Sequence, residues 1–214
     1  MNSIKTITLL FLLPALTGTV CAAEADSAPS KEYQVKAAFI YNFIKFVDWP
    51  QSADSSSDEK DGEGPKPITI GIIGENLFGS AFESITKKNI QNRPVVIKYL
   101  GGFAKNSFRD KEAGRTKYKY NDAGALRACQ VLFISPSEKK YCKEIIDTVK
   151  DNCVLTVGET KDFLGCGGIV GFITEEKKIK FEINLIAAGN AQLKVRSKLL
   201  RLAKRVIKKE EENS

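Results

Sequence analysis

The side chains that could do chemistry in this chain do not include histidine, which is absent from all 214 residues. Histidine is the most frequent general base and a near-constant ligand of catalytic zinc. A Ser-His-Asp triad, a histidine base and nearly all catalytic zinc sites are therefore excluded. An enzyme built on this sequence would depend on carboxylates, lysine or tyrosine alone, so catalysis is the least favoured of the functions considered.

A second pattern with chemical meaning is the run Gly71-Ile72-Ile73-Gly74, followed by Gly79. It ends a predicted strand, at the place where a doubly wound sheet binds the phosphates of a nucleotide. Its spacing is neither that of G-x-G-x-x-G nor that of a P-loop. We interpret it as a tight turn from strand to helix, and we expect no cofactor and no metal.

A third pattern is Phe181-Glu182-Ile183-Asn184-Leu185, at the end of the last predicted strand. Alternation along a strand puts Phe181 and Ile183 on one face and Glu182 on the other, while Asn184 is suited to cap the next helix. Two interpretations stay open. The pair is either a solvated carboxylate with a helix cap, or two polar side chains at an exposed rim that bind a partner.

Residues 32–49 are predicted to form an amphipathic helix, with Ser30 as its N-cap and Pro50 as its end. This segment holds more aromatic side chains than one buried stripe needs: Tyr33, Phe39, Tyr41, Phe43, Phe46 and Trp49. The plainer interpretation is a core helix. The alternative is that the surplus, with Tyr41 and Trp49 as candidates, lines a docking surface.

Residues 197–208 are predicted to form a second amphipathic helix, with a basic face that includes Arg201, Lys204 and Arg205. The plainer interpretation is a helix packed on the sheet with its charges in water. The alternative is attachment to an acidic partner or to lipid headgroups. We place the three basic residues with Glu182 and Asn184 among the candidate partner-binding residues.

The remaining elements alternate between strand and helix. Strands are predicted at 68–74, 95–100, 129–135, 154–157, 168–174 and 179–183, and further helices at 81–88, 137–150 and 184–190. This order predicts one α/β domain over 32–208, with a mainly parallel twisted sheet, flanking helices and a C-terminal antiparallel hairpin. Residues 51–67 and the basic segment 101–122 are predicted surface loops, 23–31 a flexible segment, and 209–214 a disordered tail.

Residues 1–22 resemble a cleavable secretory signal peptide. Lys5 precedes a short apolar run, and Val20-Cys21-Ala22 offers small residues for cleavage. The apolar run is about half the roughly 20 residues that span a bilayer. We therefore expect a mature protein outside the cytoplasm. Its formal net charge of +7 before cleavage is mild and, with that location, argues against nucleic acid as a partner.

Four cysteines remain after cleavage: Cys129, Cys142, Cys153 and Cys166. An even number in an exported chain predicts two disulfides, and no pair has the C-x-x-C spacing of a redox catalyst. Cys129 and Cys153 both begin predicted strands, whereas Cys142 and Cys166 lie towards the opposite ends. This favours Cys129–Cys153 and Cys142–Cys166, although a bend in either connection would allow Cys153–Cys166.

The chain resembles the YfiR-like family of bacterial periplasmic proteins over residues 32–206. The specific blocks are YQVKAAFIYNFIKFVDWP at 33–50, GGIVGF at 167–172, FEINL at 181–185 and SKLLRLA at 197–203. Weaker matches are IGIIG at 70–74, FG at 78–79, CQVLFI at 129–134 and LTVG at 155–158. The segment 101–122 is longer than the family pattern, and the cysteine layout overlaps it only in part, with Cys129 as its best match.

The resemblance implies a non-catalytic periplasmic regulator. Its partner would be the periplasmic part of an inner-membrane diguanylate cyclase or sensor kinase, and an outer-membrane-associated protein would release the repression. Repression of a cyclase would lower cyclic di-GMP and biofilm formation. A periplasmic small-ligand receptor that feeds a sensor kinase remains the alternative, and a homodimer is left open.

The signal sequence makes a direct prediction about the mature N-terminus. We expect the exported protein to begin near Ala23 and to carry no lipid, because Gly18-Thr19-Val20-Cys21 is a poor lipoprotein motif. Intact-mass measurement and N-terminal sequencing of the protein from the periplasm check this. An acylated Cys21 at the N-terminus would contradict it.

Overall fold

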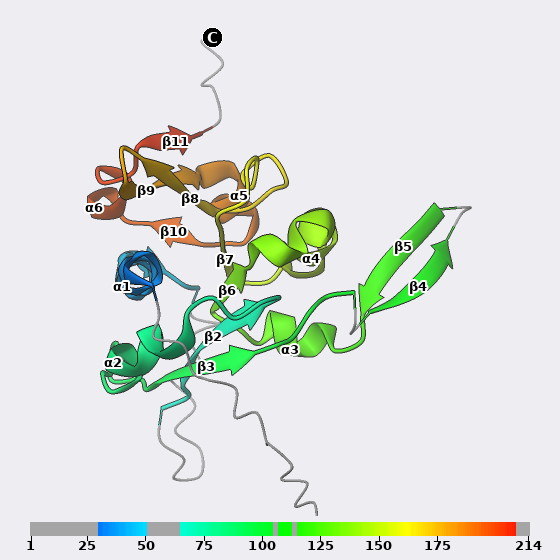
Figure 1. Ribbon diagram of the computed structural model, residues 1–214, viewed down its shortest axis with the longest axis horizontal. Helices are drawn as coiled ribbons and strands as arrows, with labels where there is room; N and C mark the ends of the chain where they lie inside the picture. The colour runs from blue at the N-terminus through cyan, green and yellow to red at the C-terminus, as the bar shows by residue number, and fades with distance from the viewer. Residues whose placement is uncertain (1–29, 51–64, 105–106, 113–114, 209–214) are drawn as a thin grey trace, which may run out of the picture.

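The computed structural model describes residues 30–50, 65–104, 107–112 and 115–208 (Figure 1). The predicted signal peptide 1–22, nearly all of the segment 23–31, most of the loop 51–67 and the tail 209–214 lie outside the described residues. Among the described helices, none is long and apolar enough to cross a membrane.

A seven-stranded sheet forms the centre of the fold, in the order β11-β9-β8-β7-β6-β2-β3. Its strands are β2 (Ile68–Ile73), β3 (Val95–Tyr99), β6 (Val131–Ile134), β7 (Leu155–Gly158), β8 (Val170–Glu175), β9 (Lys178–Asn184) and β11 (Arg205–Ile207). Every neighbouring pair is parallel except β8–β9, which is the predicted antiparallel hairpin. The predicted α/β class with a mainly parallel sheet is confirmed.

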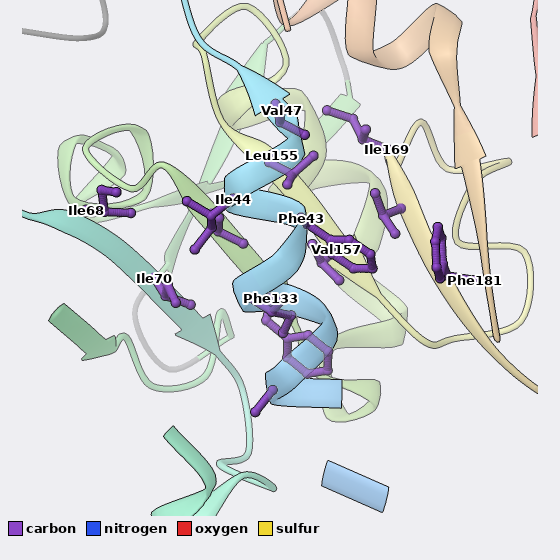
Figure 2. Packing of buried hydrophobic residues seen from close by; sticks show 14 of the residues in the cluster. Phe43, Ile44, Val47, Ile68, Ile70, Phe133, Leu155, Val157, Ile169 and Phe181 are labelled. Carbon is purple, nitrogen blue, oxygen red and sulfur yellow. The ribbon is translucent and has the colours of Figure 1, made fainter. Parts of the chain in front are cut away.

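Helix α1 (Lys31–Phe46) covers one face of the sheet. Ser30 caps it through its side chain, as predicted. The ring of Phe43 lies 5.0 Å from that of Phe181 and 5.7 Å from that of Phe172 (centroid distances), so the helix is fixed to the β8–β9 hairpin (Figure 2). The helix ends at Phe46, before the predicted end at Pro50, because β1 (Val47–Asp48) pairs with β10 (Lys194–Val195).

Helix α4 (Cys142–Val149) covers the opposite face. Successive side chains along each strand point to opposite faces of the sheet. In β6, Val131 and Phe133 pack on the α1 side, whereas Leu132 and Ile134 pack on the α4 side. The described chain has six shorter helical segments that complete the fold: η2 (Gly79–Phe82), α2 (Glu83–Thr86), α3 (Ala123–Arg127), η3 (Pro136–Tyr141), α5 (Leu185–Asn190) and α6 (Ser197–Leu200).

The prediction of a surface loop over 101–122 is wrong, because most of this segment is a β-hairpin. Strand β4 (Ser107–Glu112) pairs antiparallel with β5 (Arg115–Tyr120). The hairpin stands away from the body of the domain (Figure 1). The alternation of charged and aromatic residues, as in Lys117-Tyr118-Lys119-Tyr120, suits a strand whose partner is its own neighbour. The many basic residues of this segment are also typical of a solvated loop, which is why the sequence alone indicated a loop.

The prediction of one helix over 197–208 is also wrong. Only the short helix α6 (Ser197–Leu200) forms, and Leu202 is 64% exposed just beyond it. The β-branched pair Val206-Ile207 belongs to β11, which adds a parallel strand outside β9. The antiparallel hairpin is therefore not the edge of the sheet. The unpaired backbone of β9 offered hydrogen bonds that a helix over these residues would have left unmade.

All four described cysteines are free thiols in this structure. Cys142 and Cys166 form a side-chain hydrogen bond, and burial together with the Cys166 thiol raises the pKa of Cys142 to about 12. Cys129 is buried on the α4 side, beside Leu132 and Gly71, whereas Cys153 packs against the cluster on the α1 side. Opposite faces of one sheet work against the predicted Cys129–Cys153 pair.

The predicted Cys142–Cys166 pair stays a prediction that peptide mapping can check. In protein purified under oxidising conditions we expect a Cys142–Cys166 linked peptide, whose reduction lowers the free energy of unfolding by about 3 kcal/mol. Cys129 should become alkylatable on unfolding without reductant. Complete alkylation of Cys142 under the same conditions would contradict the pairing.

Candidate functional site

The two faces of the sheet are covered unequally, and this leaves a groove on the α4 side. Helix α4 packs against β6 and its neighbours, and the segment 159–168 folds down over β7 and β8. The ring of Phe163 lies so close to Gly158 and Gly168 that a Cβ at either position would be 2.4 Å or 2.2 Å from it. Beyond this segment, β8, β9 and β11 border a cavity of about 690 Å³.

An ion pair between two strands lies in this groove. Glu182 of β9 and Arg205 of β11 are register partners. The guanidinium donates from Nε to Oε1 at 2.9 Å and from Nη2 to Oε2 at 2.7 Å. The Glu182 side chain is 18% exposed and that of Arg205 59%. The carboxylate is thus held in place while the guanidinium remains accessible, and Glu182 raises the pKa of Arg205. Ile207 and Ile173 add apolar lining.

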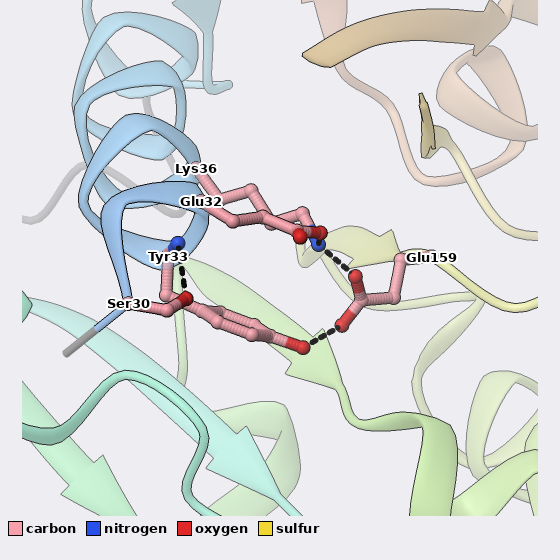
Figure 3. Close-up of polar contacts among 5 residues, drawn as sticks. All are labelled: Ser30, Glu32, Tyr33, Lys36 and Glu159. Carbon is pink, nitrogen blue, oxygen red and sulfur yellow. Dashed lines mark hydrogen bonds and ion pairs between the residues drawn. The ribbon is translucent and has the colours of Figure 1, made fainter. Parts of the chain in front are cut away.

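A polar cluster centred on Lys36 and Glu159 lies at the other end of the groove, and Figure 3 shows its contacts. The ammonium of Lys36, which is 1% exposed, contacts Oε1 of Glu32 at 2.5 Å and also pairs with Glu159. The Tyr33 hydroxyl donates to Oε1 of Glu159 at 2.7 Å. Burial and this hydrogen bond raise the pKa of Tyr33. Two carboxylates around one ammonium leave one negative charge in excess.

Sequence reasoning missed Lys36 and Glu159. A signal for Lys36 was present, because it shares a helix face with Ile40 and Phe43 and a lysine in an apolar stripe needs a buried partner. Glu159 follows β7 directly, at the carboxyl end of a parallel strand. Nothing local in the sequence indicated that the two would meet, since they are 123 residues apart.

Three of the predicted partner-binding residues come together in the groove: Glu182, Asn184 and Arg205. Asn184 is already engaged, because its Oδ1 accepts from the Ala187 backbone at 3.1 Å and so caps α5, as one of the two interpretations had it. Lys204 lies outside the groove and pairs with Glu175. Hydrogen bonds from Lys180 and Lys204 lower the pKa of Glu175 to about 2.

The other predicted residues lie elsewhere. Arg201 is exposed at the end of α6. The Tyr41 ring is flanked by the ammonium groups of Lys45 and Lys88, at 5.4 and 5.9 Å from its centroid. The Trp49 indole donates to the Cys153 carbonyl at 3.0 Å and borders a small separate cavity. The aromatic surplus of α1 therefore does not form one surface with the groove.

The described residues contain no cluster of three or more cysteine, aspartate or glutamate side chains able to hold a metal. Gly74, at the end of the glycine run, has a φ of 95°, and a Cβ there would lie 2.5 Å from Oγ of Ser137. The Ser137 hydroxyl accepts the Glu75 backbone N–H at 3.0 Å. The run therefore makes a tight turn. The Glu75 N–H, which follows it, is already bonded within the protein.

Comparison with known protein families agrees with the resemblance of the sequence to the YfiR-like family. The YfiR/HmsC-like family model matches residues 33–204. The chain belongs to the YfiR/HmsC-like family. This family consists of periplasmic signalling regulators rather than enzymes, so a regulatory role in periplasmic signalling follows.

Two further comparisons are less informative. No protein of curated function matches the sequence. A crystal structure described as a conserved domain protein from Vibrio cholerae O1 biovar El Tor has a TM-score of 0.45 and 8% identity. The match covers 81% of this chain and 60% of that one.

The buried cluster predicts an unequal cost for two similar substitutions. Glu159→Gln leaves the Lys36 ammonium buried with one carboxylate fewer, and we expect it to lower the free energy of unfolding by about 3 kcal/mol. Asp147→Asn is the matched control, because Asp147 likewise forms ion pairs with lysine, in its case with Lys143 and Lys150, but is 41% exposed. We expect it to cost less than about 1 kcal/mol. Denaturant unfolding of both variants measures the difference, and equal costs would contradict the structural role of the cluster.

Proposed function

We propose that this protein is a non-catalytic periplasmic repressor that docks on the periplasmic part of an inner-membrane diguanylate cyclase. The observation that carries the proposal is the groove with the half-exposed Glu182–Arg205 pair, in a chain of the YfiR/HmsC-like family. Repression would lower cyclic di-GMP and biofilm formation. An outer-membrane-associated partner would relieve it.

The chemistry of the groove supports a protein contact. Protein interfaces place arginine and apolar anchors inside a polar rim. Here Arg205 projects from an edge strand beside Ile207, with its guanidinium oriented by Glu182. A partner carboxylate would find a guanidinium that needs little further ordering, which reduces the entropic cost of the contact. The Glu182 carboxylate retains oxygen lone pairs for a donor from the partner.

Regulation by such a contact needs no chemistry from this chain. A repressor that binds the inactive cyclase more tightly than the active one shifts the population towards the inactive form by that difference in affinity alone. A hundredfold preference corresponds to about 2.7 kcal/mol. Relief follows when a competing partner occupies the same surface.

The proposal predicts that the partner distinguishes the positions of the negative and positive charges of the Glu182–Arg205 pair. Glu182→Lys should relieve most of the repression and raise cyclic di-GMP and surface attachment towards the level of a gene deletion. The purified variant should stay folded, because the Arg205 guanidinium is 59% exposed and loss of its ion pair costs about 1 kcal/mol. Cyclic di-GMP in cells and thermal unfolding of the purified protein are the two measurements.

The matched control is the double variant Glu182→Arg with Arg205→Glu, which restores the ion pair with reversed polarity. We expect it to unfold like the wild type and still to fail in repression. Full repression by the double variant would mean that the pair is only structural, and the docking site would be wrong. Unchanged cyclic di-GMP on deletion of the gene would contradict the cyclase as partner.

The volume of the groove favours a second candidate function. About 690 Å³ lies within the range of small-molecule sites. A small-ligand receptor that feeds a sensor kinase would show ligand-dependent thermal stabilisation of the purified protein with no partner present. A repressor that acts by protein contact alone would show none.

A further inference from the structure

The side of α1 that faces away from the sheet carries a row of side chains that the proposed function does not use. The row consists of Lys31, Val35, Ala38, Asn42 and Lys45, and all five residues are exposed. Successive members are four, three, four and three positions apart, which is the spacing with which one helix packs along another in a coiled coil. This row is called the outer face of α1.

The outer face is uncharged along its middle. Val35, Ala38 and Asn42 lie between the two lysines, and Val35 is 38% exposed. A helix face that only meets water is rich in charged and polar residues along its whole length. A β-branched residue, a small residue and a single asparagine at these positions are instead typical of a contact between helices, in which the asparagine specifies the register.

Three lysine ammonium groups at the borders of the outer face are held over aromatic rings. Those of Lys45 and Lys88 lie 5.4 and 5.9 Å from the centroid of the same ring, that of Tyr41. That of Lys198 lies 5.1 Å from the centroid of the Phe46 ring. Within the described part of the chain, none of the three lysines forms an ion pair with a carboxylate. Two ammonium groups on one ring repel each other, and an anion beside them would offset this repulsion.

The lysines border both sides of the outer face because α1 runs between two other helices. Figure 1 shows α2, α1 and α6 in one row with α1 in the middle, and α1 contacts both α6 and η2, which leads into α2. The exposed charged residues of α1, of 83–88 and of α6 are five basic and two acidic: Lys31, Lys45, Lys87, Lys88, Lys198, Glu32 and Glu83. Glu32 is already paired with Lys36. This excess of positive charge favours an anionic partner.

We infer that the outer face of α1 binds an acidic amphipathic helix of a partner protein. The apolar stripe of such a helix packs on Val35 and Ala38. Its flanking carboxylates reach Lys45 and Lys88 on one side and Lys198 on the other. The outer face and these flanking lysines share no residue with the lining of the groove, so the inference does not rest on the proposed function.

Two other occupants fit the outer face less well. A second copy of this chain would bring two positively charged faces together, and these repel each other. A lipid surface is entered by large apolar or aromatic side chains, whereas the middle of the outer face offers Ala38 and Asn42. A partner helix suits a small residue there, because the distance between two packed helices is set by the side chains at their contact.

The test uses the purified exported protein and two fluorescently labelled synthetic peptides of three heptads, roughly 21 residues each. Both peptides carry leucine at positions a and d. One carries glutamate at e and g, and the other carries lysine there. We expect fluorescence anisotropy to show saturable binding of the glutamate peptide only, and weaker binding as salt shortens the Debye length. No binding of the glutamate peptide, or equal binding of the lysine peptide, would overturn the inference.

Two variants separate the charges of the outer face from its packing. Lys88→Glu with Lys198→Glu should weaken binding of the glutamate peptide about tenfold or more, because like charges then face each other. Ala38→Lys should also weaken it although it adds a positive charge, since the new ammonium lies in the middle of the contact and must lose water. Stronger binding by Ala38→Lys would mean that charge alone attracts the peptide, and the packing of a helix on this face would be wrong.

The matched control for the charge reversal is Lys98→Glu with Lys177→Glu, which changes exposed residues of β3 and of the β8–β9 turn. It alters the net charge by the same amount, and we expect its binding to stay within about twofold of the wild type. All variants should unfold thermally like the wild type, because every substituted position is exposed. Equal weakening by the control would overturn the assignment to α1.

The remaining outcomes identify another occupant or separate this inference from the proposed function. If the protein ignores both peptides but sediments with phosphatidylglycerol vesicles, or forms a dimer that Ala38→Lys dissociates, the outer face meets lipid or a second copy and the inference is wrong. If the glutamate peptide binds as expected while Glu182→Lys leaves repression intact, the outer face stands and the groove assignment fails.

Discussion

The packing of Phe43 between α1 and the β8–β9 hairpin is the contact on which the rest of this structure depends. Its ring meets Phe172 and Phe181, one from each strand of the hairpin. Phe39 adds contacts to the same two rings. Aromatic pairs of this kind contribute beyond the area that they bury. Because α1 is fixed along this line, its N-terminal half brings Lys36 to Glu159 and its end brings Val47 to Val195. One helix thereby connects the carboxyl end of β7 with the separate two-stranded sheet of β1 and β10.

Covering one face so completely leaves the other face with less chain to cover it. Helix α4 and the segment 159–168 cover the middle of the sheet, and the strands beyond them border the groove. The late addition of β11 widens this open part and brings Arg205 to Glu182. The groove is therefore a consequence of where the helices end as much as of the residues that line it. Its two ends carry unlike charge patterns: a half-exposed arginine at one end and an excess carboxylate at the other.

The groove belongs to a chain whose family consists of periplasmic signalling regulators. The groove is concave and holds its charges in fixed pairs, as suits a specific contact.

The sequence by itself determined the buried strands, the cap at Ser30, the cap at Asn184 and the β8–β9 hairpin, because apolar periodicity and side-chain capping are local signals. It also indicated Glu182 and Asn184 through strand alternation. It was wrong for 101–122 and 197–208, where helix or loop tendencies were weaker than hydrogen bonds offered by a neighbouring strand. Only the tertiary structure decided that Arg205 meets Glu182 and that Lys36 meets Glu159, the latter pair 123 residues apart. A charge pattern records which side chains need a partner, but the partner is chosen by how the sheet is ordered and where α1 lies across it.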